Sequence, residues 1–208
     1  MKKVIMSMTV ALLMIGAPAL AAPAVNGPTG LINSPTADVL RLEQFSIGYY
    51  QLKDSRVGTF TTNVAKNVEV GVSAFHYESH QNKNYSHIKF ALAPEQILTP
   101  GFALGVEGIA DHEKPSLYAV ASKALPFGFR IHAGIGNGRF GGMFASIEKT
   151  INPVSIRSSK NAFPTTTLIA EYDGKNMNYA ARLAVATGLK LDIGLRNHDG
   201  YAGISFTN

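Results

Sequence analysis

Apolar residues alternate with small or polar residues along most of the chain that follows residue 43. In the segment 68–77, Val68 and Val70 share one face, opposite Glu69 and Gly71. The same alternation recurs in 102–110, 127–136, 179–185 and 189–196. Strands of about ten residues with this period are typical of membrane barrels, in which one face meets lipid and the other faces the interior. After residue 22, no helical stripe of comparable length competes with this pattern.

Turn-forming dipeptides divide this region into twelve predicted strands. The strands lie near 44–53, 57–63, 67–77, 84–93, 101–110, 116–125, 127–136, 139–149, 165–173, 177–186, 189–196 and 200–206. Asn137-Gly138 is the strongest two-residue hairpin signal, and Asp199-Gly200 is a weaker one. We therefore predict an all-β fold, a closed antiparallel transmembrane β-barrel of about twelve strands with both termini at the periplasmic end. The long segment 151–164 would lie at that end, where turns are usually short, so ten or fourteen strands are the alternatives.

A soluble β-sandwich would produce a similar alternation, with its polar face in water. In this chain, the residues opposite the apolar face are mostly Gly, Ala and Ser, with about one charge per strand. A solvated face usually carries a mixture of Lys, Glu and Thr instead. The composition of the polar face therefore favours the barrel over the sandwich.

The first residues have the pattern of a cleaved secretion signal. Lys2 and Lys3 precede an apolar run over 4–15, and Ala19-Leu20-Ala21 supplies a small-x-small cleavage site. The apolar run is about a dozen residues long, too short for the roughly twenty that a spanning helix needs. We expect residues 1–21 to be removed, and a retained anchor helix is the alternative.

Composition agrees with an exported barrel. The chain has 208 residues and no cysteine, so no disulfide framework supports it outside the cytoplasm. Charged residues are 16%, there are 20 glycines, and tryptophan is absent. Without Lys2 and Lys3 the formal net charge falls from +5 to +3, which is too small to indicate nucleic acid as a partner. We expect one domain, a barrel over 44–208 in the outer membrane of a diderm bacterium, with membrane lipid around it and no cofactor.

The predicted interior face carries balanced charge, with six residues of each sign. The positive residues are Lys89, Lys123, Arg130, Arg182, Lys190 and Arg196, and the negative residues are Glu69, Glu107, Glu148, Glu171, Asp173 and Asp192. Selective pores usually have one dominant sign, whereas a narrow barrel that fills itself pairs its charges. We expect a mostly closed interior, and a wet lumen is the alternative.

Two stretches interrupt the strand pattern. The first is a segment over 22–43 that is rich in Gly and Pro and is neither helix nor regular strand. Its distinctive residues are Gly27, Gly30, Leu31, Ile32, Pro35 and Thr36. Because it also carries large apolar residues, we expect it to pack inside the barrel mouth and to plug or brace the periplasmic end. A disordered leader is the alternative.

The second stretch places Glu171 and Asp173 two residues apart on the interior face. This spacing suits a cation or sugar contact, but an ion pair with Arg182 on the next strand explains it as well and is favoured. The predicted interior polar cluster contains Glu171, Asp173, Arg182, Lys190, Asp192 and Arg196.

Catalytic and metal motifs are weak. No Gly-x-Ser-x-Gly elbow occurs, and His132 on the interior face beside Arg130 indicates a polar network. His76, Glu78, His80 and His87 could approach one another across a hairpin, but surface histidines explain them better. We therefore expect neither an enzyme nor a metal site.

Three stretches resemble the YjbH-like family. They are Gly-x-x-Gly-Leu-Ile-x-x-Pro-Thr-Ala at 27–37, the Gly141-Gly142 strand, and Ala-Glu-Tyr-Asp-Gly at 170–174 followed by Asn178 and Arg182. The family consists of outer-membrane β-barrel proteins associated with exopolysaccharide or capsule production. The resemblance implies a structural or accessory role in making, moving or anchoring surface polysaccharide, with polysaccharide or export-assembly proteins as partners. A porin-like diffusion channel for small solutes and an outer-membrane hydrolase are the rival functions.

Overall fold

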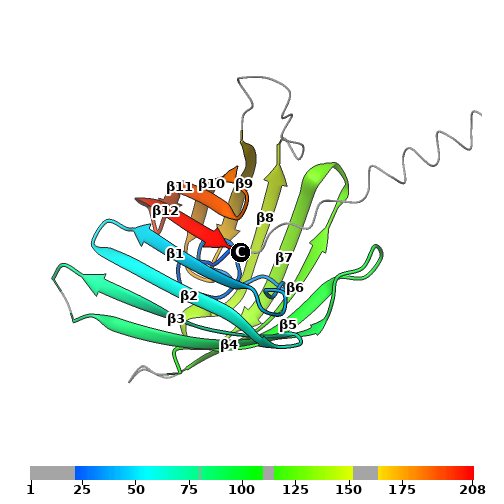
Figure 1. Ribbon diagram of the computed structural model, residues 1–208, viewed down its shortest axis with the longest axis horizontal. Coiled ribbons are helices and arrows are strands. Elements are labelled where there is room, and N and C mark those ends of the chain that lie inside the picture. The colour runs from blue at the N-terminus through cyan, green and yellow to red at the C-terminus, as the bar shows by residue number, and fades with distance from the viewer. Residues whose placement is uncertain (1–21, 80, 110–114, 152–163) are drawn as a thin grey trace, which may run out of the picture.

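A computed structural model of the chain describes residues 22–79, 81–109, 115–151 and 164–208. Twelve antiparallel strands form a closed barrel within these residues, which confirms the predicted fold class and strand number (Figure 1). The predicted signal at 1–21 and most of the long segment 151–164 lie outside the described residues and stay predictions. No helix in the described part of the chain is long and apolar enough to span a membrane.

The strand boundaries match the sequence pattern closely. The strands are β1 (Phe45–Gln51), β2 (Ser55–Ala65), β3 (Val68–Tyr77), β4 (Lys83–Ala93), β5 (Gly101–Glu107), β6 (Ser116–Ala124), β7 (Phe129–Gly136), β8 (Gly142–Thr150), β9 (Thr165–Tyr172), β10 (Met177–Ala186), β11 (Leu189–Arg196) and β12 (Asp199–Thr207). Two short 3-10 turns, η1 (Pro126–Gly128) and η2 (Gly138–Phe140), join β6 to β7 and β7 to β8.

Each strand pairs with its neighbours in sequence, and the first strand closes the barrel on the last. In this seam Ser46 faces Thr207, and Gln51 faces Ala202. Closure leaves no strand edge unpaired, which removes the template that open sheets offer to other chains.

Two predicted turns are wrong in detail. Asn137-Gly138 is not a two-residue hairpin, because the chain forms η2 there and reverses at Gly141, whose φ is 64°. Asp199 and Gly200 already belong to β12, and Asn197 and His198 form the turn with φ values of 52° and 72°. Asparagine is the non-glycine residue that most readily adopts this left-handed conformation, so Asn197 was the better signal.

The barrel is apolar outside and polar inside, as the alternation predicts. Each strand exposes a large apolar side chain on its outer face: Ile47, Phe60, Val72, Phe90, Leu104, Leu117, Ile135, Ile147, Leu168, Tyr179, Ile193 and Ile204. Each also buries a polar side chain on its inner face: Ser46, Thr61, Glu69, Lys89, Glu107, Ser122, His132, Ser146, Glu171, Arg182, Asp192 and Ser205. Lys123 was predicted inside, but it lies on the outer face of β6, where its ammonium bonds the carbonyls of Gln96 and Ile97.

We call residues 22–43 the plug; residues 22–40 lie inside the barrel, and the last three residues before β1 are exposed (Figure 1). Leu31 and Ile32 join a buried core with Tyr50, Val57 and Ile169 from the wall. The plug was predicted to lie at the end where the chain termini lie; Asp38 pairs with Arg130 there, but the plug also extends to the other end. Asn33 meets Arg196 beside the β11–β12 turn, at the opposite end. Within the described residues, the plug is already buried at Ala22, turns near the far end at Asn33 and returns to start β1.

We expect Gly203→Ala to destabilise the barrel by about 1–3 kcal/mol, because a methyl group there would overlap the ring of Tyr50. Tyr50 is buried, and its hydroxyl donates to the carbonyl of Pro23 at 2.6 Å, so the ring has little room to move. Gly58→Ala is the matched control, since nothing lies within 4 Å of a Cβ at that position. Guanidinium unfolding in detergent measures both variants, and equal midpoints would contradict the expectation.

Candidate functional site

The lumen wall binds the backbone of the plug through two buried carboxylates. The first is Glu171 on β9, which is fully buried. It accepts the consecutive backbone N–H groups of Ile32 at 3.1 Å, Asn33 at 2.8 Å and Ser34 at 3.0 Å. Successive N–H groups that point the same way form a nest for an anion. Glu171 therefore fixes the tip of the plug.

The second carboxylate is Glu69 on β3. It accepts the N–H groups of Thr29 at 2.8 Å and Leu40 at 3.1 Å, and also the hydroxyl of Thr29. Lys89 on β4 lies 3.2 Å from Glu69 and donates to the carbonyl of Thr29 at 2.7 Å. Both side chains of this ion pair are fully buried, so the pair and the plug satisfy each other.

Arg182 on β10 binds the plug carbonyls from the opposite wall. Its guanidinium donates to Gly30 at 3.1 Å and Leu31 at 2.9 Å. The predicted ion pair with Glu171 or Asp173 is wrong, because Arg182 pairs with Asp192 at 2.7 Å and 2.8 Å. The strand register explains this result, since Arg182 faces Asp192 on β11 and Thr167 on β9.

Asn33 at the tip of the plug binds two further residues of the predicted interior polar cluster. Asp173 accepts its amide N–H at 2.6 Å, and Arg196 donates to its amide oxygen at 2.6 Å. Burial alone would raise the pKa of Asp173, but hydrogen bonds from Asn33 and from the backbone N–H of Asn176 outweigh it and lower that pKa. Lys190 is buried on the same inner face as Asp192.

The plug sequence suits this position. Gly27 has φ 111°, which residues with a side chain rarely adopt, and a Cβ at Gly30 would meet the backbone oxygen of Ser34. Gly30 forms an isolated bridge with Pro35, which brings the two arms of the plug together. The N–H of Thr36 donates to the carbonyl of Thr29 at 3.2 Å. Gly27 lies in a turn at 24–28, and the other five predicted residues belong to a second, hairpin-like turn over 29–36.

Sequence reasoning missed three charged residues of this site. Asp38 and Glu95 lie outside the predicted strands, and Arg139 lies in η2 rather than in the strand predicted to begin there. Arg139 in η2 pairs with Glu107 at 2.6 Å and donates to the carbonyl of Asn33 at 2.9 Å. Asp38 of the plug pairs with Arg130 at 2.7 Å, and Glu95 in the β4–β5 loop pairs with Arg130 at 2.8 Å. Burial tends to raise the pKa of Asp38, but Arg130 outweighs it and lowers that pKa to about 2.

A Ser-His-Glu arrangement lies inside the barrel. The Ser122 hydroxyl is 2.7 Å from His132 Nδ1, and His132 Nε2 is 3.4 Å from Glu148. The backbone N–H of Ala37 in the plug donates to the same Ser122 oxygen at 2.8 Å. Ser122 and His132 are nearly fully buried, and the plug covers the Ser122 hydroxyl, which would be the nucleophile in a Ser-His-Glu hydrolase. The arrangement holds the returning arm of the plug.

The histidines weighed as a metal site were predicted to be surface residues, which is wrong for the buried His87. His76 lies on the outer face of β3, whereas His87 on β4 is buried inside, 3.9 Å from Glu69. His80 lies outside the described residues. Within the described ranges, no group of three or more His, Asp or Glu residues has a geometry that could hold a metal ion.

Comparison with known families places this geometry in context. The family model YjbH, described as "Exopolysaccharide biosynthesis protein YbjH", matches residues 24–162, about two thirds of the chain. The chain belongs to this family. The match begins inside the plug and covers β1 to β8. The matched region therefore contains most of the plug, together with Glu69 and Lys89. No curated protein matches the chain.

YjbH membership links the chain to exopolysaccharide production and confirms the resemblance seen in the sequence. The structure adds a physical reason for that resemblance. The Gly-x-x-Gly-Leu-Ile motif and the Ala-Glu-Tyr-Asp-Gly motif are far apart in sequence, but Glu171 of the second motif binds the backbone of the first. The two motifs form one contact.

We expect Glu171→Ala to lower the free energy of unfolding by about 3 kcal/mol or more, because three buried N–H groups lose their acceptor. The plug should also become sensitive to protease in detergent. Asp199→Asn is the control, since Asp199 pairs with Lys53 on the exposed rim and should change little. Chemical unfolding and limited proteolysis measure both variants. A Glu171→Ala barrel as stable and as protected as the parent would contradict this role.

Proposed function

We propose that this protein is an outer-membrane β-barrel with a structural or accessory role in exopolysaccharide production or export. The observation that carries the proposal is the inverted polarity of the barrel. All twelve strands expose a large apolar side chain, and all twelve bury a polar one. Soluble monomers rarely expose contiguous apolar patches above a few hundred Å². An apolar belt around a closed barrel instead suits lipid.

The plug favours an accessory role over a diffusion channel. Glu69, Lys89, Glu171 and Arg182 direct their polar atoms at the plug backbone. A wall used in this way offers few free groups to a passing solute. The ion pairs behind it also keep the net charge of the lumen low, unlike the walls of selective pores.

A non-enzymatic role is part of the proposal. Catalysis by Ser122 would need a substrate within hydrogen-bond reach of the hydroxyl. The N–H of Ala37 donates to the oxygen of that hydroxyl at 2.8 Å, and the same oxygen lies 2.7 Å from His132 Nδ1. Family membership supports the link to polysaccharide, and export-assembly proteins are the partners we expect.

The location and the closed lumen can be tested together. The mature chain should fractionate with the outer membrane on a density gradient, and a freely soluble monomer without detergent would contradict the proposal. In planar bilayers the purified protein should give no large steady openings. Deletion of residues 22–43 should produce them, because the plug fills the lumen. Heat-modifiable migration in gels verifies that each variant has folded.

Ser122→Ala separates the accessory role from a hydrolase. We expect a strain that carries only this variant to make wild-type amounts of exopolysaccharide, provided that the barrel reaches the membrane. Deletion of the gene should reduce that amount. A loss with Ser122→Ala as large as with gene deletion, at an equal level of folded barrel, would support the hydrolase instead.

A further inference from the structure

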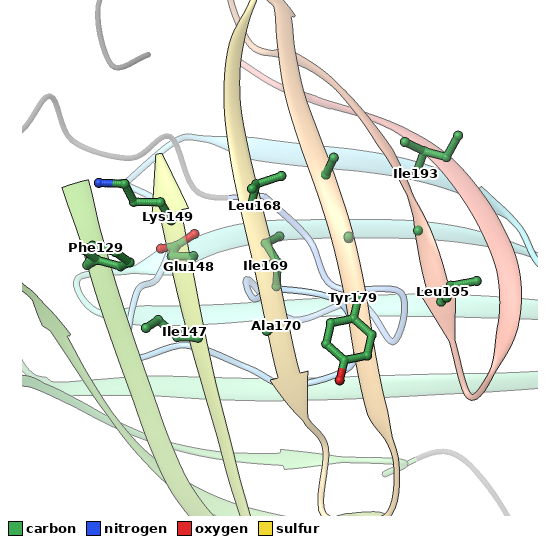
Figure 2. Close-up of a pocket in the computed structure, with 13 residues that line it drawn as sticks. Phe129, Ile147, Glu148, Lys149, Leu168, Ile169, Ala170, Tyr179, Ile193 and Leu195 are labelled. Atoms are coloured by element: carbon green, nitrogen blue, oxygen red, sulfur yellow. The ribbon is translucent and has the colours of Figure 1, made fainter. Parts of the chain in front are cut away.

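The outer wall of the barrel is hollowed between β7 and β11 (Figure 2). The groove has a volume of about 510 Å³, within the range of roughly 300–1,000 Å³ that is usual for small-ligand sites. Its lining is almost wholly apolar. It lies on the face that the proposed function assigns to lipid, so an inference about its occupant rests on that function.

Two alanines form the floor of the groove. Ala170 on β9 faces Tyr179 on β10, and Ala181 on β10 faces Leu168 on β9. Large side chains therefore surround two adjacent small ones on the outer face. The side chains that border this floor are Phe129, Ile147, Leu168, Tyr179, Ile193 and Leu195 (Figure 2). The result is a slot that crosses three strands.

One cation marks the end of the groove nearest the chain termini. Lys149 lies one residue from the end of β8, on its outer face, between Phe129 and Leu168 in the strand register. Its ammonium is 4.2 Å from the centre of the Phe129 ring and donates to the carbonyl of Phe127. These contacts hold a positive charge at the edge of the apolar belt, where lipid phosphates lie.

We propose that this groove binds one phospholipid, with an acyl chain over Ala170 and Ala181 and the phosphate on Lys149. Bulk lipid is as apolar as the groove, so the hydrophobic effect cannot select an occupant there. Selection comes from the fit of a narrow chain to the slot and from attraction between phosphate and ammonium. A second copy of the chain would have to bury the Lys149 ammonium against an apolar wall, which favours the lipid.

The test uses barrel extracted from membranes in mild detergent and examined by native mass spectrometry, then titrated with phosphatidylglycerol. The parent should retain one phospholipid. Ala181→Phe fills the floor, and Lys149→Met removes the charge; each should weaken retention about tenfold, which corresponds to 1.4 kcal/mol. Ala119→Phe, on the outer face of β6, and Lys66→Met, in the β2–β3 turn at the same end, are controls that should bind like the parent.

Two results would overturn the lipid site. One is retention by Ala181→Phe equal to that of the parent. The other is a parent dimer that carries no lipid and that Ala181→Phe converts to a monomer, which would make the groove an interface between copies. If the barrel fractionates with the outer membrane but Ala181→Phe keeps its lipid, only this site fails. If the chain proves soluble, the proposed function fails first.

Discussion

The constraint on which this barrel depends is the cost of burying polar and charged groups in a narrow lumen. A buried carboxylate or ammonium is tolerated only when it is paired and hydrogen-bonded. Glu69, Lys89 and Glu171 are fully buried, yet each has partners because the plug brings peptide N–H and C=O groups to them. A peptide backbone without regular secondary structure has the matching need, since its own polar groups require partners too. The wall side chains and the plug backbone therefore satisfy each other's buried hydrogen-bonding groups.

This reciprocity explains why the motifs at 27–37 and 170–174 occur in the same chain. Gly30 permits the tight turn at the tip of the plug, and the apolar residues after it anchor this turn in the core. Glu171 then accepts the N–H groups that the turn leaves unpaired. A change to either motif leaves the other with buried and unsatisfied groups. In this chain, the plug and the wall that holds it therefore act as one structural unit.

Much of this architecture could be predicted from the sequence, because a period of two assigns each residue to a face once the strand is recognised. Val72 outside and Glu69 inside follow directly from that rule. The pairing of inner residues could not be predicted, since it depends on the register between strands. For this reason Arg182 forms its ion pair with Asp192 rather than with Glu171. Asp38 belongs to no strand, so no periodic signal marked it, and Arg139 points inward only because η2 replaces the start of the predicted strand 139–149.

The seam of the barrel has a consequence for how the protein is assembled. β1 follows the plug directly and is also the strand that pairs with β12 to complete the cylinder. Phe45 and Asn208 clasp each other at this join, with the N–H of Phe45 donating to the Asn208 side chain at 2.7 Å. A cylinder that closed while empty would have to admit the whole of residues 22–43 through its mouth afterwards. Filling before closing avoids that passage, so we expect the lumen to be loaded before β1 pairs with β12 during biogenesis.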